Sequence, residues 1–480
     1  MKKNSTTLMS VLFIALVSCS SVAQKAKGQQ TKKPNVLFIL ADDLGVNALN
    51  SYGNELVESP NIDKLYNEGM HFTNGYSNDP TCAPSRASIM SGQYVSRHHV
   101  YRVANRYLKD EKTRVHMKYL PPSNYTLRGS GGGLALDKVT MGEAFQQNGY
   151  VTSAYGKWHL GKNALGIPHQ GFTEGFEIKG HYNFHTSPEQ PNIDNTEYSA
   201  DVITRKTKQF IAKSVKAGKP FFAYVPYYLV HKPLEPKPEY LKYFREKYKG
   251  KDKLDDDEVK ILAMIKSLDD GVGELTDYVK SLGIEDNTII VFTSDNGHYK
   301  TANRIFTLPY KGYKGQTYEG GIRVPYIFKW KGKIKPGAVS KEPIIHVDIY
   351  PTVLSLTNSK LPDNYPLDGE DITPILFGKT TKTKRDALVW EYTNYARYNT
   401  KKKTFASEWI NVIQKDGFKM TEVIENGSYY MFNLNNDPYE TKEIIKDYPK
   451  EAAKLKARLE QWKKETGYEA PKENPEFIGK

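Results

Sequence analysis

The chain has 480 residues, of which 39% are apolar, and its formal net charge of +13 corresponds to a pI near 9.1. This length is enough for one large domain with a smaller one attached, and the apolar content is ordinary for a soluble globular protein. The chain has too few cysteines for a disulfide scaffold. The positive charge favours an acidic partner, such as nucleic acid, an anionic lipid surface or an acidic polysaccharide, and charge alone does not choose among them.

The N-terminus, over residues 1–23, indicates a signal peptide. A basic start precedes an apolar run over residues 8–17, which is too short to span a bilayer. The four residues that end at Cys19 are similar to a bacterial lipobox, which favours cleavage before this cysteine and its lipidation. Cleavage after Ala23 is the alternative. We therefore expect a periplasmic or cell-surface lipoprotein, or a secreted protein if the lipobox is not used, with residues 24–34 as a linker and no other attachment to a membrane.

Short apolar runs next along the chain predict buried parallel strands, at residues 35–41, 220–225 and 288–293. Residues 258–280 have apolar side chains at helical spacing and predict a helix before the third strand. Helices between buried strands indicate an α/β fold.

Oxygen-bearing side chains follow two of these strands. Asp42 and Asp43 come directly after the first, and Asp295 and Asn296 come shortly after the third. Sites in α/β folds gather at the carboxyl ends of strands, and hard oxygen ligands suit Ca²⁺ or Mg²⁺ rather than zinc. Each pair taken alone is also typical of a turn or a helix cap. Their occurrence at two strand ends favours a metal site.

Cys82 opens the pentapeptide Cys-Ala-Pro-Ser-Arg. Pro84 fits the first turn of a helix and Gly92 is a natural stop, so a short helix is expected between them. Cys82 would then lie at the N-terminus of this helix, where free N–H groups and the helix dipole favour an anion. The alternative is a buried free cysteine with a packing role only.

Basic residues and histidines appear in three further segments. Lys157 and His159 lie on a glycine-flanked loop after an expected strand, which gives a fixed cation beside a group that transfers protons near neutral pH. His231 follows the second buried strand and is placed to donate a proton. Lys314 lies in a loop rich in glycine and lysine at residues 310–325. Taken singly, each segment is also typical of a surface lysine, a packed histidine or a solvated loop.

The pattern changes after residue 374. Short antiparallel strands separated by turns are expected from residue 388 to residue 434, and a terminal helix is expected at residues 449–465. We therefore predict a main domain over residues 35–374 and a C-terminal subdomain of α+β type over residues 375–480.

Together and in this order, the motifs resemble those of the type I sulfatases of the alkaline phosphatase superfamily. The resemblance runs from about residue 35 into the C-terminal subdomain. It implies an α/β fold in which a large, mixed, mostly parallel sheet is sandwiched by helices, with a smaller C-terminal α+β domain that carries an antiparallel sheet.

The resemblance also implies a reaction and its cofactors. Cys82 would be oxidised by a formylglycine-generating maturase to formylglycine (3-oxoalanine), whose hydrate attacks the sulfur of a sulfate ester and then expels sulfate. One divalent cation, Ca²⁺ with Mg²⁺ as the alternative, would be held by Asp42, Asp43, Cys82, Asp295 and Asn296.

Five further residues receive roles from the resemblance. Arg86 and Lys157 would steady the formylglycine hydrate and the sulfate. Lys314 and His231 would bind the sulfate and its bridging oxygen, and one of them would protonate the leaving alcohol. His159 would act as the base in the later step.

The expected substrate is a sulfated polysaccharide or oligosaccharide, because the chain is basic and exported. Algal material such as ulvan, carrageenan or fucan is favoured over glycosaminoglycans. Residues 97–133 are rich in arginine, lysine and tyrosine and are interpreted as a long surface insertion. We hypothesise that this insertion binds sugar through His98, Arg102 and Arg106, and a solvated basic loop is the alternative.

Two other functions stay open at this point. A phosphodiesterase or phosphonate hydrolase of the same superfamily shares the cysteine motif and the metal ligands, although Asn296 and Lys314 favour a site with one metal. A catalytically inactive, sugar-binding surface lipoprotein is the other. Nucleic-acid binding is a poorer interpretation because no recognised motif accompanies the charge.

Overall fold

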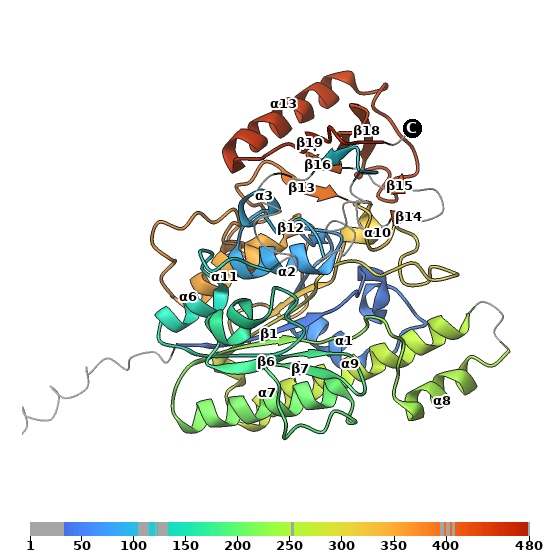
Figure 1. The fold of residues 1–480 in the computed structure, drawn as a ribbon. Coiled ribbons are helices and arrows are strands. Elements are labelled where there is room, and N and C mark those ends of the chain that lie inside the picture. The colour runs from blue at the N-terminus through green and yellow to red at the C-terminus, as the bar shows by residue number, and fades with distance from the viewer. Residues whose placement is uncertain are drawn as a thin grey trace, which may run out of the picture. The chain divides into compact units, whose positions relative to one another are not determined.

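A nine-stranded sheet forms the centre of the fold, in the order β11-β2-β10-β9-β1-β8-β5-β6-β7 (Figure 1). Neighbours from β9 to β6 run parallel, whereas β10 is antiparallel to both its neighbours and β7 is antiparallel to β6. The strands are β1 (Asn35–Ala41), β2 (Met70–Phe72), β5 (Val151–Gly156), β6 (Glu174–Lys179), β7 (His185–Ser187), β8 (Phe221–Pro226), β9 (Thr288–Ser294), β10 (Tyr326–Lys329) and β11 (Ala338–Ser340).

The computed structural model describes residues 33–103, 115–120, 122, 133–250, 254–393 and 409–478, together with the backbone of two short strands at 398–399 and 404–405. All bounds and contacts given below refer to these residues.

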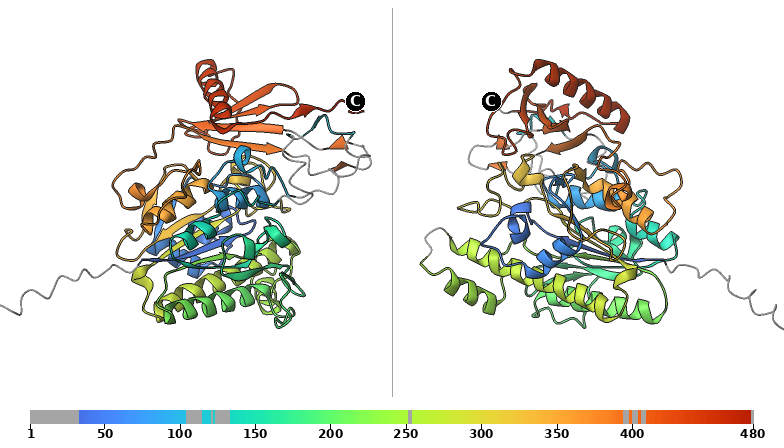
Figure 2. Two further views of the ribbon diagram at one scale, coloured as in Figure 1. Left: turned by 60° about the vertical axis from the view of Figure 1, so that its left-hand side comes forward. Right: turned by 180° about the vertical axis from the view of Figure 1, so that it is seen from behind.

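The alternating side chains of β1 divide the core into two layers. Leu37 and Ile39 are buried in one apolar cluster, and Val36, Phe38 and Leu40 are buried in another. Because successive side chains of a strand point to opposite faces, each cluster lies on one face of the sheet. Helices α1 (Pro60–Glu68), α7 (Ser199–Lys216), α8 (Pro238–Lys247) and α9 (Asp256–Ser281) cover the first face, and α2 (Cys82–Ser91), α6 (Met141–Gln147) and α11 (Ile349–Leu356) cover the second (Figure 2).

Helix α2 has the predicted ends. It begins at Cys82, directly after Thr81, and its last residue is Ser91, which is followed by Gly92 with a left-handed φ of 65°. Glycine adopts this conformation without the steric cost of a Cβ, which is why it terminates the helix. Every residue of α2 is buried, so the helix is covered by other parts of the protein on all sides.

A second, four-stranded antiparallel sheet follows in the order β13-β16-β17-β18. Helix α13 (Pro449–Thr466) contributes Leu455, Leu459 and Trp462 to an apolar cluster that also contains residues of this sheet. The strands are β13 (Leu388–Thr393), β16 (Trp409–Lys415), β17 (Phe418–Val423) and β18 (Ser428–Asn433). The predicted fold class, a mostly parallel α/β sheet with a small antiparallel one, is therefore confirmed. Since residues 34–480 form one unit, the boundary at residue 374 stays a prediction.

The insertion predicted at the surface is partly packed against this second sheet. Tyr101 and Met117 are buried in a small cluster with Val95 and Trp409, and the rings of Tyr101 and Trp409 lie 5.8 Å apart. The beginning of the segment is therefore not a solvated loop, because its aromatic side chain is covered by β16. The short elements of the fold are α3 (Val95–His98), α10 (Glu319–Ile322), α12 (Thr373–Leu376), β3 (Gly75–Tyr76), β4 (Tyr119–Leu120), β12 (Ile344–Ile345), β14 (Tyr398–Asn399), β15 (Thr404–Phe405) and β19 (Lys472–Glu473).

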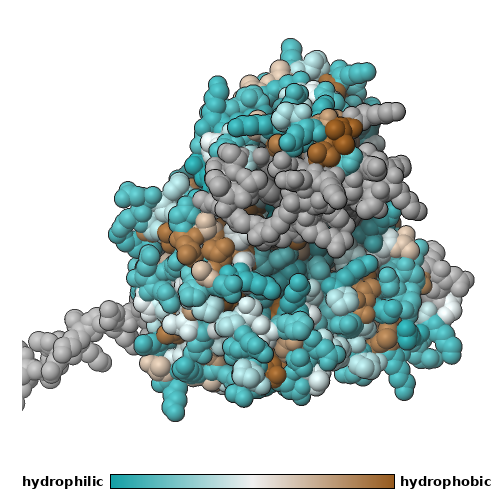
Figure 3. Space-filling view, in the orientation of Figure 1, coloured by the Kyte–Doolittle hydropathy of each residue, from teal (hydrophilic) through white to brown (hydrophobic). Residues whose placement is uncertain are grey.

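Hydrophilic residues cover most of the face shown in Figure 3, in keeping with apolar side chains gathered in the core. Within the described part of the chain, none of the helices combines the length and the apolar character needed to cross a membrane.

Candidate active site

The carboxyl ends of β1 and β9 bring three carboxylates together. The two strands pair in parallel, with Ala41 opposite Ser294, so Asp42 and Asp43 emerge beside Asp295. Ligand atoms of these three aspartates and the sulfur of Cys82 all lie within 4.8 Å of one another. The four side chains are buried, with at most 1% of each residue exposed. Four groups far apart in sequence therefore form one buried cluster.

This cluster has the donor set of a site for a hard divalent cation. The amide nitrogen of Asn296 donates hydrogen bonds to Asp43 Oδ1 at 2.8 Å and to the carbonyl of Gly297 at 2.9 Å. Its amide oxygen is buried and has no hydrogen-bond partner among the residues that the structure describes. A buried, unpaired oxygen beside three carboxylates fits oxygen coordination of Ca²⁺ or Mg²⁺. Burial, and then the charge of Asp295, raise the pKa of the Asp42 carboxyl to about 7, which shows the repulsion that a cation would relieve.

Three basic side chains surround the carboxylates. Arg86 donates from Nε to Asp295 at 2.8 Å, and the ammonium group of Lys157 forms an ion pair with Asp42. The Lys314 ammonium lies 2.6 Å from Asp43 Oδ1. Burial alone would raise the pKa of Asp43, but the surrounding basic groups, with Lys314 the largest contributor among them, together outweigh burial and hold that pKa below its usual range. Positive charge is thus fixed on several sides of the cluster.

Backbone hydrogen bonds place the loop that carries Lys314. The N–H of Lys314 donates to the carbonyl of His298 at 2.8 Å, and the N–H of Gly315 donates to the carbonyl of Pro80 at 2.9 Å. The loop therefore bridges the segment after β9 and the segment before α2. As a result the Lys314 ammonium also lies 3.3 Å from the sulfur of Cys82.

The Cys82 thiol itself is held in its neutral form. Burial, and then the charge of Asp295, raise its pKa well above the ordinary value. Its sulfur lies 3.5 Å from Asp42 Oδ1 and 3.7 Å from Asp43 Oδ1. Because the thiolate is the reactive form of cysteine, an unmodified thiol in this position is a poor nucleophile near neutral pH.

Two histidines accompany the cluster. His231 Nε2 lies 3.9 Å from Asp43 Oδ2, and burial followed by the charge of Lys157 lowers the pKa of His231 to about 3. Burial and the same lysine charge lower the pKa of His159 well below its ordinary value. Both rings are therefore neutral near pH 7, and a neutral ring is able to accept a proton.

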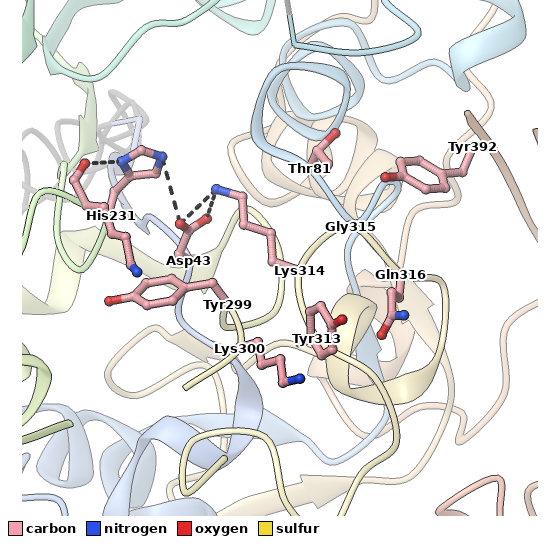
Figure 4. A pocket seen from close by; sticks show the side chains of 11 residues that line it. Asp43, Thr81, His231, Tyr299, Lys300, Tyr313, Lys314, Gly315, Gln316 and Tyr392 are labelled. Atoms are coloured by element: carbon pink, nitrogen blue, oxygen red, sulfur yellow. Dashed lines mark hydrogen bonds and ion pairs between the residues drawn. The ribbon is translucent and has the colours of Figure 1, made fainter. Parts of the chain in front are cut away.

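A cavity of about 480 Å³ opens beside Asp43, His231 and Lys314 (Figure 4). Its volume lies within the range of about 300–1,000 Å³ typical of pockets for small ligands. The rest of its lining is Thr81, Lys232, Tyr299, Lys300, Tyr313, Gly315, Gln316 and Tyr392.

Comparison with known families decides what this arrangement belongs to. The family model for sulfatases matches residues 34–359, more than half of the chain. The chain belongs to the sulfatase family. A second model, for the C-terminal part of N-sulphoglucosamine sulphohydrolase, matches residues 313–465. The resemblance to type I sulfatases of the alkaline phosphatase superfamily is therefore confirmed, and the protein is a sulfuric ester hydrolase.

Relatives match this sulfatase over nearly its whole length. A sulfatase of Formosa agariphila is 29% identical over 94% of this chain and 92% of its own. The N-acetylgalactosamine-6-O-sulfatase of Bacteroides thetaiotaomicron is 27% identical over 95% of this chain and 99% of its own. The crystal structure of Ps i-CgsB in complex with k-i-k-neocarrahexaose is 27% identical, covers 92% of this chain and 95% of that chain, and has a TM-score of 0.74.

Two of the three residues predicted to bind sugar in this sulfatase are buried and do not line the cavity. His98 is fully buried, where its Nε2 is hydrogen-bonded to Ser88 at 2.9 Å and its Nδ1 accepts from the N–H of Val100 at 3.0 Å. The prediction that His98 contacts the sugar directly is wrong, because no surface of the ring is accessible. Arg102 is only 4% exposed. Arg106 lies outside the described residues.

Sequence reasoning missed several residues beside the carboxylates. His298 is buried, with its Nδ1 2.9 Å from the carbonyl of Asp43. His346 links α2 to β9, since its Nδ1 is hydrogen-bonded to Ser85 at 2.8 Å and its Nε2 to the carbonyl of Ser294 at 2.9 Å. The position of His298, two residues after Asn296, was the available signal for it. Nothing in the sequence around His346 indicates its contacts.

Proposed function

We propose that this sulfatase removes sulfate from a sulfated oligosaccharide or polysaccharide, with a formylglycine made from Cys82 and one divalent cation, Ca²⁺. The observation that carries the proposal is the position of Cys82. Its sulfur lies at the start of α2, next to the carboxylates and 3.3 Å from the Lys314 ammonium.

The environment of Cys82 supports its modification. A thiol whose pKa is raised by burial and by nearby carboxylates offers little thiolate, so the unmodified residue is unsuited to attack sulfur. When present, the hydrated aldehyde supplies one hydroxyl that attacks sulfur and a second hydroxyl whose deprotonation releases sulfate.

The divalent cation would be held by Asp42, Asp43, Asp295 and Asn296, beside residue 82. When bound, it supplies positive charge that offsets the negative oxygens of the sulfate ester. Ca²⁺ is proposed over Mg²⁺ because it accepts irregular geometry with several protein oxygens, whereas Mg²⁺ usually keeps several waters.

The surrounding side chains would orient the reacting groups, neutralise negative charge and transfer protons. Arg86 and Lys157 stay charged and orient the nucleophile and the carboxylates, and Lys314 neutralises a sulfate oxygen. His231 faces the cavity (Figure 4), where the negative charge of a bound sulfate raises its pKa and lets it carry the proton for the leaving alcohol. His159, which is neutral, accepts the proton from the second hydroxyl.

Relatives support a sugar substrate. One acts, by name, on N-acetylgalactosamine 6-O-sulfate groups, and another was crystallised with k-i-k-neocarrahexaose. Both correspond to the sulfated saccharides expected from the basic charge of the chain. Algal polysaccharide remains our first choice within this class. We also propose export, with Cys19 as the lipidated residue, which fractionation of the native host and labelling with a fatty acid would test.

The test begins with peptide mass spectrometry across residues 81–86 of protein produced with a maturase. We expect an aldehyde at Cys82, turnover of an aryl sulfate and of sulfated algal oligosaccharides, loss of activity on chelation and recovery with Ca²⁺. An unmodified thiol, in cells that convert a control sulfatase, would refute the nucleophile. Aryl phosphate diesters serve as the comparison, because faster turnover of these would favour the phosphodiesterase alternative. The Lys314 ammonium beside Asp43 and the Cys82 sulfur counts against that alternative, because it favours a site with one metal.

A further inference from the structure

The cavity beside the cluster contains more positive charge than one sulfate ester requires. Among the described lining residues, three are lysines, Lys232, Lys300 and Lys314, and one is a carboxylate, Asp43. Lys314 forms an ion pair with Asp43, with 2.6 Å between the ammonium nitrogen and Oδ1. The other two lysines therefore add positive charge that nothing in the lining neutralises.

Lys232 and Lys300 have no acidic partner in the part of the chain that the structure describes. Both are exposed, and each lies near an aromatic ring of the cavity. The Lys232 ammonium is 4.8 Å from the centre of the Tyr299 ring, and the Lys300 ammonium is 5.8 Å from the centre of the Tyr313 ring. Cation–π contacts of this kind orient an ammonium group without neutralising its charge.

The elements that carry these lysines are tied to the reaction centre. Lys232 follows His231 directly, and Lys300 follows His298, whose carbonyl accepts the hydrogen bond from the N–H of Lys314. Figure 4 shows Lys300 and Tyr313 below Lys314, with Gln316 and Tyr392 to the right of it. A group held by these lysines would thus lie close to the reacting sulfate, on the same sugar unit or its neighbour.

We propose that the cavity has a second anion subsite, formed by Lys232 and Lys300, and that the preferred substrates carry another sulfate or a carboxylate beside the sulfate ester that is hydrolysed. This inference rests on the proposed function and narrows its substrate class. The rings of Tyr299 and Tyr313 and the amide of Gln316 suit the apolar and hydroxyl faces of a sugar.

The test uses three aryl sulfates, so that it does not depend on the identity of the sugar. They are phenyl sulfate, a phenyl sulfate with a neighbouring carboxylate, and a phenyl ring with two neighbouring sulfates. For at least one doubly charged compound, the aldehyde-bearing wild type should have a kcat/KM about tenfold higher than for phenyl sulfate, mainly because KM is lower. This preference should decrease as the ionic strength rises. Comparison of the carboxylate with the second sulfate tells which anion the subsite takes.

We define the preference ratio as kcat/KM for a doubly charged compound divided by kcat/KM for phenyl sulfate. The variant Lys232→Gln/Lys300→Gln should bring this ratio close to one. Lys216→Gln, which removes the same charge from an exposed position at the end of α7, should leave the ratio as in the wild type. Equal kcat/KM values for all three compounds in the wild type, or a ratio that the double variant preserves, would overturn the subsite. Failure of the aldehyde-bearing protein to hydrolyse any sulfate ester would instead overturn the proposed function.

Discussion

At the scale of single residues, the site is a balance of buried charges. Three aspartates are matched by the buried side chains of Arg86 and Lys157 and by Lys314, whose side chain is 20% exposed. Burying a charge is costly unless it is paired, so each of these side chains depends on its partners.

Replacement of Lys314 by methionine should lower kcat for an aryl sulfate by about 10²- to 10³-fold, the loss typical when one stabilising donor is removed from a developing oxyanion. The side chain nearly keeps its length and a bound divalent cation would still offset the charge of Asp43, so the fold should persist. Steady-state kinetics on aldehyde-bearing protein provides the measurement. Lys333→Met removes an exposed lysine that does not line the cavity and should retain wild-type kcat. A Lys314→Met enzyme with unchanged kcat would exclude the assigned role.

Buried neutral histidines should make the protein sensitive to acid. Burial lowers the pKa of His346 to about 3 in the folded state, against 6.5 for an ordinary histidine. Below about pH 6.5 the unfolded chain therefore binds protons that the native state does not, and the free energy of unfolding falls as the pH drops toward 3. Thermal melts from pH 8 to 4 should show this fall.

The slope should be shallower in His346→Gln, which keeps a polar side chain but cannot titrate, with a difference on the order of a few kcal/mol. His185→Gln is the matched control, because His185 is exposed. Parallel slopes for the wild type and His346→Gln would show that this ring is not responsible.

At the scale of elements, a close contact between the ends of β5 and β8 fixes the position of Lys157. Gly156 ends β5 with a φ of 130°, and a Cβ added there would lie 2.0 Å from the carbonyl oxygen of Pro226 at the end of β8. The next residue, Lys157, donates its N–H to that same carbonyl at 2.8 Å. The orientation of Lys157 therefore depends on the absence of a side chain at residue 156.

Gly156→Ala should destabilise the protein by at least about 3 kcal/mol, since the clash is with backbone and cannot be relieved by a rotamer change. It should also reduce kcat by displacing Lys157. Gly149→Ala provides the control: its φ of 82° is also left-handed, but an added Cβ meets nothing within 4 Å. That variant should lose only about 1–2 kcal/mol. Equal losses in denaturant melts would contradict the clash.

At the scale of the whole molecule, a buried ion cluster connects the second sheet to the loop that carries Lys314. Lys419 on β17 lies 2.9 Å from Glu319 at the start of α10 and 3.0 Å from Glu440. The hydroxyl of Tyr76 donates to Glu319 at 3.0 Å. Helix α10 follows the Lys314 loop within a few residues, so the C-terminal sheet helps to fix the active site.

Lys419→Met should therefore lower the free energy of unfolding by about 3–5 kcal/mol, because it leaves buried carboxylates without their shared cation. Thermal unfolding measures the loss, and addition of Glu440→Gln should recover part of it. Lys415→Met, on β16, removes a partly exposed pair with Asp386 and should cost no more than about 1 kcal/mol. A Lys419→Met protein as stable as Lys415→Met would rule out this connection.

Much of the fold follows from local pattern. The run at residues 35–41 is β1 as predicted, and the predicted helices at residues 258–280 and 449–465 correspond to α9 and α13. Apolar runs and caps are properties of neighbouring residues, and therefore they are visible in the sequence. The packing of Tyr101 on Trp409 was not visible, because it joins segments about three hundred residues apart.

The sequence by itself determined the chemistry of this protein: a cysteine motif, acidic residues after apolar strands, and lysines and histidines on glycine-rich loops, in an order that identifies a sulfatase. Only the tertiary structure decided which of these groups share one cluster, that His98 is a packing residue, and that Lys232 and Lys300 face the cavity. Residue type and local spacing are encoded along the chain, whereas distance, burial and the pKa changes they cause depend on parallel pairing of strands far apart in sequence.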